Sequence, residues 1–200
     1  MEYVSLAVAL AAFISVLWLL AKRRARYYDV ALRLNREAAC WLCLPLTLLC
    51  AGGVNHSLLV SLCVVTGACV SAATDRQTGY IFDVVLGACF LATVATRIST
   101  GELLTATFLG MTACGGCMML IRAITGGRGM GLGDVKLALL VGSLGPVVGA
   151  IAIGSAFVVG AVFALVSLMR GYHRFGEALP FGPYLAVGVY GTVAAGALGW

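Results

Sequence analysis

The chain has 200 residues, of which 62% are apolar or aromatic and 10% are charged. A typical soluble domain is about 25% charged, so this composition excludes an ordinary water-soluble domain and favours a protein that lies in the bilayer. The 4 prolines and 26 glycines follow no collagen-like period and lie among apolar runs, which excludes fibrous and disordered classes.

Apolar runs separated by polar breaks predict about eight membrane-spanning helices. In chain order they occupy residues 3–21, 38–54, 58–74, 80–97, 102–121, 136–150, 151–169 and 183–199. One crossing takes about 20 residues, so these runs leave little chain for a domain outside the membrane. We therefore expect residues 1–200 to form a single all-α, polytopic membrane helix bundle.

Basic residues follow the first apolar run, at Lys22, Arg23, Arg24 and Arg26, and none precedes it. A cleaved signal peptide has its positive charges before the apolar stretch, so we interpret this run as an uncleaved anchor with the N-terminus outside. All 13 Lys and Arg residues except Arg97 then fall on the cytoplasmic side, in agreement with the positive-inside rule. Topology thus explains the net charge of +5, and we expect the lipid bilayer, not nucleic acid, as a partner.

The 8 cysteines include two CxxC pairs, Cys40 with Cys43 and Cys114 with Cys117. Both pairs lie in apolar sequence, whereas structural zinc sites usually bring such pairs together over short polar loops. We interpret them as packing residues and expect no metal and no cofactor. A site shared by the two pairs is the alternative, because both lie near the cytoplasmic ends of their helices.

Acidic side chains at bilayer depth are costly and therefore mark candidate functional sites. Asp75 ends the third predicted span and Asp134 opens the sixth, so the topology brings both to the cytoplasmic face. Two carboxyls that meet in a partly dry site share one proton, the arrangement that aspartic proteases use. Most of the other acidic residues fall at outer helix ends or in cytoplasmic loops, namely Glu2, Asp29, Glu37, Glu102 and Glu177.

Five glycines surround Asp134 on its N-terminal side, at positions 126, 127, 129, 131 and 133. They remove helical preference where a buried helix should begin, and they let another backbone approach closely. A cleavable peptide must be extended, and a glycine-lined segment can pair with its main chain. The alternative is a flexible turn in which Asp134 caps the sixth helix.

Three segments together resemble the type IV prepilin peptidases, membrane-embedded aspartic proteases with a Gly-x-Gly-Asp signature. Residues 131–136, Gly-Leu-Gly-Asp-Val-Lys, are similar to the second catalytic motif of the family, and residues 75–83 are similar to the first. Residues 179–186, Leu-Pro-Phe-Gly-Pro-Tyr-Leu-Ala, are similar to the segment that opens the last helix of the family. The resemblance covers residues 58–199.

The resemblance implies that Asp75 and Asp134 are the catalytic pair of an endopeptidase in the inner membrane. It implies that the basic leaders of type IV prepilins or pseudopilins are removed at the cytoplasmic face. It leaves open whether the enzyme acts alone or as a homodimer, and an archaeal preflagellin peptidase is an alternative. Residues expected to line the substrate site are Gly131, Gly133, Lys136, Pro180, Phe181, Gly182 and Pro183.

Two features depart from the family pattern. Phe82 stands where the family usually has proline, which leaves the turn after Asp75 less sharply defined, and we expect Asp83 to cap or orient the fourth helix. The loop 22–37 is short, basic and free of cysteine. Long members of the family carry two closely spaced CxxC pairs in this loop and also N-methylate the product. We therefore expect cleavage without methylation.

Two other functions fit the same features. A small ion-coupled transporter or channel would use a glycine-broken helix and Asp134 to line its path, and it predicts transport that depends on a proton or sodium gradient. A non-catalytic assembly protein of a pilus or secretion system predicts that neither Asp75 nor Asp134 is needed for function.

Overall fold

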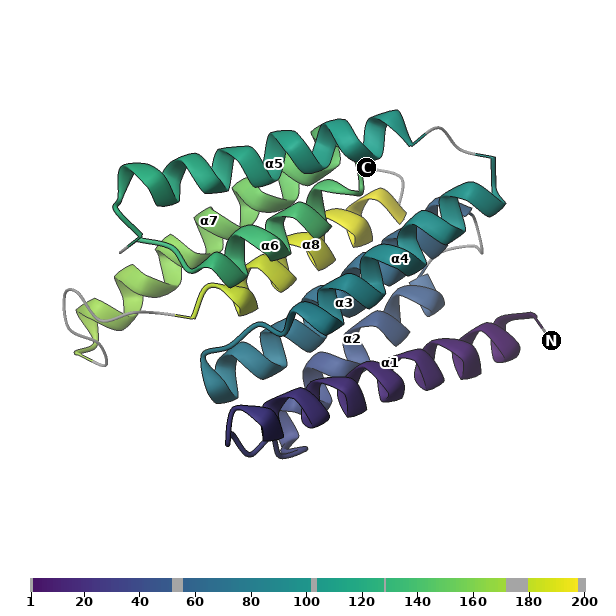
Figure 1. Ribbon diagram of the computed structural model, residues 1–200, viewed down its shortest axis with the longest axis horizontal. Helices are drawn as coiled ribbons and strands as arrows, with labels where there is room; N and C mark the ends of the chain where they lie inside the picture. Colours follow the sequence, from purple (N-terminus) through teal and green to yellow (C-terminus); the bar gives the residue numbers. More distant parts are fainter. Residues whose placement is uncertain (1, 52–55, 102–103, 128, 172–179, 198–200) are drawn as a thin grey trace.

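All regular structure in the described part of the chain is helical (Figure 1). The structure, a computed structural model, describes residues 2–51, 56–101, 104–127, 129–171 and 180–197. Within these ranges the helices are α1 Glu2–Tyr27, α2 Arg36–Ala51, α3 His56–Thr78, α4 Asp83–Ser99, α5 Thr105–Ile124, α6 Leu132–Gly142, α7 Pro146–Met169 and α8 Gly182–Ala197. The predicted all-α membrane helix bundle is confirmed. Glu102 and Glu177 lie outside the described residues, as do the last two residues of the predicted span 183–199.

Helix α3 is the centre of the bundle. It packs against α1, α2, α4, α6 and α8, and Figure 1 shows the helices running side by side. In α3, 78% of the most apolar stretch is buried, against 22–28% in α1, α5 and α7. Small buried residues, among them Gly67, Ala68 and Ala72, let the neighbouring helices approach α3 closely.

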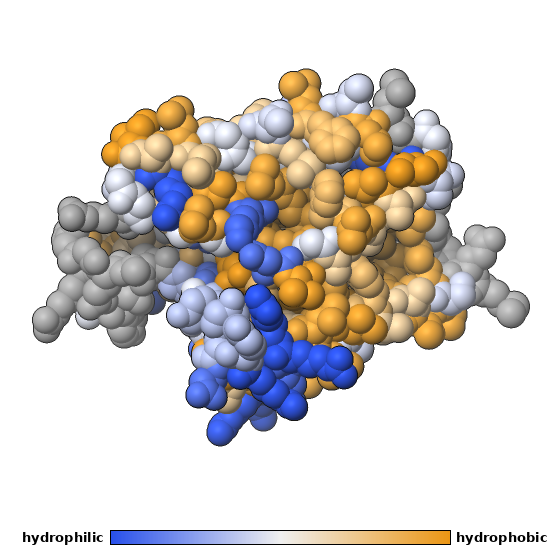
Figure 2. All heavy atoms as spheres, viewed as in Figure 1, coloured by the Kyte–Doolittle hydropathy of each residue, from blue (hydrophilic) through white to orange (hydrophobic). Residues whose placement is uncertain are grey.

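Large apolar side chains cover much of the outer surface, as expected where lipid is the solvent. Leu91, Leu109 and Met169 are 67%, 61% and 80% exposed, and Figure 2 shows hydrophobic residues over most of the visible face. Four helices, α1, α3, α5 and α7, are long and apolar enough to cross a membrane by length and composition. Hydrophilic residues gather toward the end of the bundle where α1 ends (Figure 2).

The predicted span 136–150 is wrong, because a turn at residues 143–145 divides it between two helices. Helix α6 ends at Gly142, and residues 146–150 belong to α7. Gly145 has a φ of 121°, a conformation that glycine adopts without strain, and Pro146 begins α7 because it has no N–H to donate. The 11 residues of α6 rise about 16 Å, roughly half of the hydrocarbon thickness.

The backbones of α5 and α6 meet through glycine. A Cβ atom on Gly110 would overlap the carbonyl oxygen of Gly142 and lie 2.7 Å from the carbonyl carbon of Gly145. A Cβ atom on Gly142 would in turn lie 2.7 Å from the carbonyl carbon of Gly110. Only residues without a side chain permit this approach, which fixes the C-terminal end of the helix that carries Asp134.

We expect Gly110→Ala to lower the melting temperature of the purified protein in detergent, because the new methyl group would overlap backbone atoms. Overpacking of this kind costs about 1–3 kcal/mol. Gly116→Ala, on the same helix, is the matched control, since its methyl group would meet nothing within 4 Å. Its melting temperature should be unchanged or higher, because alanine favours the helix. Equal melting temperatures for the two variants would contradict the close approach of α5 and α6.

Candidate active site

Asp75 lies in the last turn of α3, where the side chain is 8% exposed. Its Oδ2 atom accepts a hydrogen bond of 3.1 Å from the backbone N–H of Gly182, at the start of α8. A Cβ atom on Gly182 would lie 2.8 Å from the same oxygen. The glycine at this position therefore allows the carboxyl group of Asp75 to reach the N–H groups at the start of α8.

Asp134 occupies the third position of α6, after the N-cap residue Gly131. The Asp134 Oδ2 atom accepts a hydrogen bond of 3.2 Å from the backbone N–H of Gly131, the side-chain half of a capping box. The structure thus contains the capping contact that the sequence offered as an alternative. Capping also gives the carboxyl group a fixed place at the beginning of the helix.

The structure brings the segments of Asp75 and Asp134 together. A Cβ atom on Gly133 would lie 3.0 Å from the Cβ of Ile81, in the turn that follows Asp75. Burial, and after it the negative charge of Asp75, raises the pKa of Asp134 to about 6, while the hydrogen bond from Gly131 acts in the opposite direction. Asp134 lies in the first turn of α6, which is not among the four described helices long and apolar enough to cross a membrane. The two carboxyl groups therefore lie near enough to influence each other.

The turn after Asp75 is held without proline. Gly79 has a φ of 69°, and its N–H donates a hydrogen bond of 2.7 Å to the carbonyl oxygen of Asp75. Phe82 takes the N-cap position of α4 with φ −87° and ψ 121°, and it is 3% exposed. Burial of the Phe82 ring in the core anchors the turn at the place where proline would have restricted the backbone.

Residues 180–183 form the entrance to α8. Phe181 and Pro180 are half-buried, whereas Gly182 and Pro183 are buried. The ring of Phe181 packs on Phe157 of α7, with the ring centroids 5.0 Å apart. This segment therefore fixes the N–H of Gly182 against Asp75, and Pro183 has no N–H of its own to compete.

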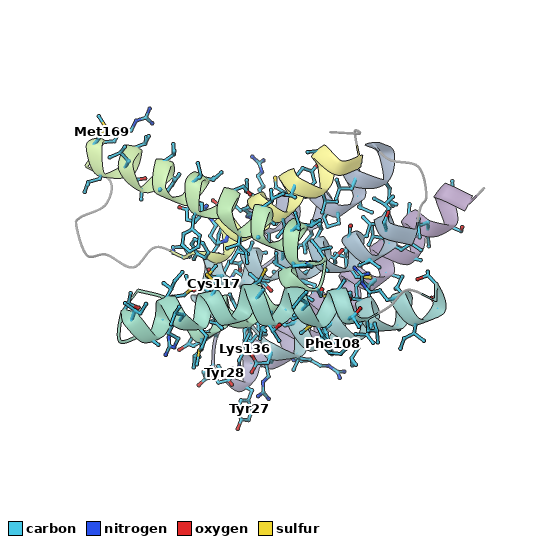
Figure 3. All side chains as sticks on the ribbon, turned by 90° about the horizontal axis from the view of Figure 1, so that it is seen from above. Tyr27, Tyr28, Phe108, Cys117, Lys136 and Met169 are labelled. Carbon is cyan, nitrogen blue, oxygen red and sulfur yellow. The ribbon has the colours of Figure 1, made fainter. Side chains whose placement is uncertain are left out.

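Lys136, which was expected to line the site, contacts α4 instead of the aspartates. Its Nζ atom lies 2.8 Å from each carboxylate oxygen of Asp83. Among the described residues, no hydrogen bond or ion pair joins Lys136 to Asp75 or Asp134. Figure 3 shows Lys136 on the same side of the bundle as Tyr28. Asp83 begins α4, and its carboxylate bonds to Lys136 in place of a capping role.

The loop between α1 and α2 and the first turn of α2 pack on the end of α3, contacts that the sequence analysis missed. The N–H of Arg33 donates to the Gln77 side chain at 3.1 Å. Arg76 donates to the Glu37 carboxylate, also at 3.1 Å, in an ion pair. The available signal was the opposite charges of Arg76 and Glu37 on the same predicted side of the membrane.

Ser71 lies one helical turn before Asp75 and was also missed. Its side chain is 1% exposed, and the hydroxyl has no hydrogen-bond partner among the described residues. Residues four apart share one face of a helix, so Ser71 lies on the side of α3 that carries Asp75. A buried hydroxyl without a partner is uncommon. The sequence signal for Ser71 was its position four residues before Asp75.

The two CxxC pairs lie on α2 and α5, which make no contact with each other in the described structure. Cys40, Cys43 and Cys117 are exposed, and Cys114 is buried. Within the described ranges, no group of three His, Cys, Asp or Glu side chains is placed to hold a metal ion. The shared site that the sequence offered as an alternative is not formed in this arrangement.

Curated proteins similar to this chain carry the name prepilin leader peptidase/N-methyltransferase. Two come from Burkholderia pseudomallei, strains 1026b and K96243, and are 34% identical over 133 residues, which cover 62% of this chain and 42% of each relative. A third, from Stutzerimonas stutzeri, is 39% identical over 80 residues, covering 40% of this chain and 28% of the relative. The matches thus span less than half the length of these relatives. No family model and no solved structure matches the chain.

We expect Asp134→Asn to stabilise the fold above pH 6 and to have no such effect below about pH 4. A carboxyl whose pKa is raised by folding stabilises the protein while it is protonated, and this stability is lost as the pH rises through the folded pKa. The rise of the Asp134 pKa from 3.8 to about 6 predicts that the variant gains at most about 3 kcal/mol in free energy of unfolding at pH 8. Asparagine keeps an acceptor for the N–H of Gly131.

The measurement is thermal unfolding in detergent from pH 4 to pH 8. Asp29→Asn is the control, because Asp29 is exposed and has a φ of 57°, which asparagine adopts readily. A stability difference for Asp134→Asn that does not change with pH would contradict the raised pKa.

Proposed function

We propose that this chain, whose curated relatives support its assignment to the type IV prepilin peptidase family, is a membrane-embedded aspartic endopeptidase. Asp75 and Asp134 are its catalytic pair. Its substrates are prepilins or pseudopilins, from which it removes the short basic leader in front of the apolar helix. N-methylation is not part of the proposal.

The observation that carries the proposal is the convergence of two carboxyl groups from segments far apart in the sequence. Asp75 ends α3 and Asp134 begins α6, and the charge of Asp75 contributes to the raised pKa of Asp134. Two carboxyls in this situation titrate as a pair, in which one keeps its proton to a higher pH than an isolated aspartate does. One ionised and one protonated carboxyl are what peptide hydrolysis by an aspartic protease needs.

In the proposed mechanism, the ionised carboxylate takes a proton from a water molecule whose oxygen attacks the scissile carbonyl carbon. The protonated partner donates its proton to the carbonyl oxygen, which gives a neutral tetrahedral diol. Collapse of the diol breaks the C–N bond: the protonated carboxyl donates its proton to the leaving amine nitrogen, and the ionised carboxylate takes a proton from a hydroxyl of the diol, which becomes the product carboxylic acid. The pair ends with one proton, as it began, and titrates as a unit.

The N–H of Gly182 stabilises the ionised form of Asp75 through its hydrogen bond of 3.1 Å. Residues 129–131 precede α6 without helical structure, so their backbone groups close to Asp134 could pair with an extended peptide. Pro180 and Phe181 directly precede Gly182, whose N–H bonds to Asp75, and we propose that they form the opposite wall. A leader peptide would thus lie between the start of α6 and the start of α8.

The charges support a cytoplasmic position for the pair. Basic residues in the described part of the chain lie at the same end of the bundle as Asp75 and Asp134, including Arg26, Arg76, Arg122 and Arg170. Arg97, at the opposite end of α4, is the exception. The positive-inside rule places such an end in the cytoplasm, so we propose an inner-membrane protein that meets the leader where it leaves the bilayer.

Asp75→Asn and Asp134→Asn should each abolish leader removal, because neither variant can pass one proton between two carboxyls. The assay is the size shift of a co-expressed prepilin that has a basic leader, a glycine and then an apolar helix. Asp29→Asn, on the exposed turn after α1, should cleave normally. Cleavage retained by either variant, or transport driven by an ion gradient in place of cleavage, would contradict the proposed function.

Gly182→Ala should slow cleavage by about tenfold or more, because the new methyl group would lie 2.8 Å from Asp75 Oδ2 and displace a reacting group. Gly191→Ala is the control on the same helix, since its methyl group would meet nothing within 4 Å. The initial rate of leader removal is compared for the two variants at equal expression. Equal rates would show that the contact between Gly182 and Asp75 does not affect the reaction.

A further inference from the structure

An ion pair connects the two segments that carry the aspartates. Asp83 is the first residue of α4 and follows Asp75 by eight positions, and Lys136 follows Asp134 by two. The Lys136 Nζ atom lies 2.8 Å from both Oδ1 and Oδ2 of Asp83. One ion pair, in which the ammonium group contacts both carboxylate oxygens, thus joins the start of α4 to the start of α6.

Apart from the packing of its buried face, the start of α6 is held by a small number of contacts. The helix has 11 residues, and it follows Gly126 and Gly127, which have φ values of 60° and 77°. Two further contacts hold this region from outside: Arg122 donates a hydrogen bond to the carbonyl oxygen of Met130, and Gly133 packs on Ile81. The Lys136 contact is the ion pair that ties the start of α6 to the element following Asp75.

Lys136 makes no hydrogen bond or ion pair with Asp134 among the described residues. Residues two apart on a helix point in nearly opposite directions, so the ammonium group faces α4 while the Asp134 carboxyl faces α3. Asp83 likewise lies beyond the turn that separates it from Asp75. The pair therefore links the backbones that carry the two carboxyls without entering the site.

We infer that Asp83 and Lys136 are positioning residues, whose ion pair holds the start of α6 against α4 and so sets the separation of Asp75 and Asp134. This inference rests on the proposed function and adds to it. The pair is open to solvent, with side-chain exposures of 46% for Lys136 and 67% for Asp83, so it contributes little to overall stability. A displacement of about 1 Å in a catalytic group, by contrast, lowers turnover by up to about 100-fold.

A groove of about 350 Å³ beside the pair provides the competing explanation. It lies between α4, α5 and α6 and is lined by Gly87, Phe90, Met111 and Leu139 together with the ion pair. If substrate lay in this groove, Asp83 and Lys136 would bind it directly. Loss of either charge would then raise KM, and exchanging the two charges would not restore binding.

The first experiment measures kcat and KM for a purified prepilin that wild-type enzyme cleaves. Lys136→Met and Asp83→Asn should each lower kcat by about 10- to 100-fold, with KM changed less than about twofold and the melting temperature unchanged. Lys136→Arg, which keeps the ion pair, should retain most activity. The exchange Asp83→Lys with Lys136→Asp should recover at least about tenfold over either single variant. A rise in KM without loss of kcat, or an exchange that recovers nothing, would overturn the inference.

The second experiment does not depend on cleavage. The titration of the Asp134 carboxyl is followed by difference infrared spectroscopy, with Asp134→Asn as the blank. Loss of the positive charge in Lys136→Met would by itself raise the pKa of Asp134, whereas moving Asp134 away from Asp75 lowers it. We expect the pKa to fall, and an unchanged or higher pKa would overturn the inference. If the wild-type protein cleaves no prepilin but Lys136→Met still lowers the pKa of Asp134, the proposed function is refuted and the positioning role is kept.

Discussion

Two carboxyl groups, one buried and one half-buried, meet at the end of the bundle where α3, α6 and α8 come together, and burial followed by their mutual repulsion disfavours the state in which both are ionised. Backbone groups stabilise the ionised carboxyls: the N–H of Gly182 donates a hydrogen bond to Asp75, and the N–H of Gly131 donates one to Asp134. Helix N-termini supply these donors, because their first N–H groups have no partner within the helix. The pKa of Asp134 is still raised, so burial and repulsion exceed the stabilisation from these donors.

Helix packing makes this arrangement possible by placing small residues where backbones must approach. Gly110 and Gly142 bring α5 and α6 into backbone contact, and Gly182 makes room for the Asp75 carboxyl. A large residue is used at Phe82, whose buried ring fixes the turn at a position where proline would otherwise restrict the backbone. The site is therefore held by packing on three sides, while α6 itself is too short to cross the bilayer alone.

The loop between α1 and α2 contributes contacts to the same end of the bundle. The hydrogen bond of Arg33 to Gln77 joins this loop to the last turn of α3, and the ion pair of Arg76 with Glu37 joins the first turn of α2 to the same turn. The curated relatives, of which the matches cover less than half, are named for two activities. The short basic loop of this chain packs on the segment of Asp75, which gives it a structural part in the bundle.

Composition and the positions of charge were enough to predict a helical membrane bundle, since apolar length and basic flanks depend on local sequence alone. The two aspartates could also be singled out, because a carboxyl in an apolar chain is conspicuous. The boundary between α6 and α7 was misplaced, as the apolar run continues through Gly145 while the backbone reverses there. The partners of Lys136, Arg76 and Gly182 lie between 39 and 107 residues away, and such pairings leave no periodic trace in the sequence. Tertiary packing alone decided them, because it sets which helix ends come within the few ångströms that an ion pair or hydrogen bond requires.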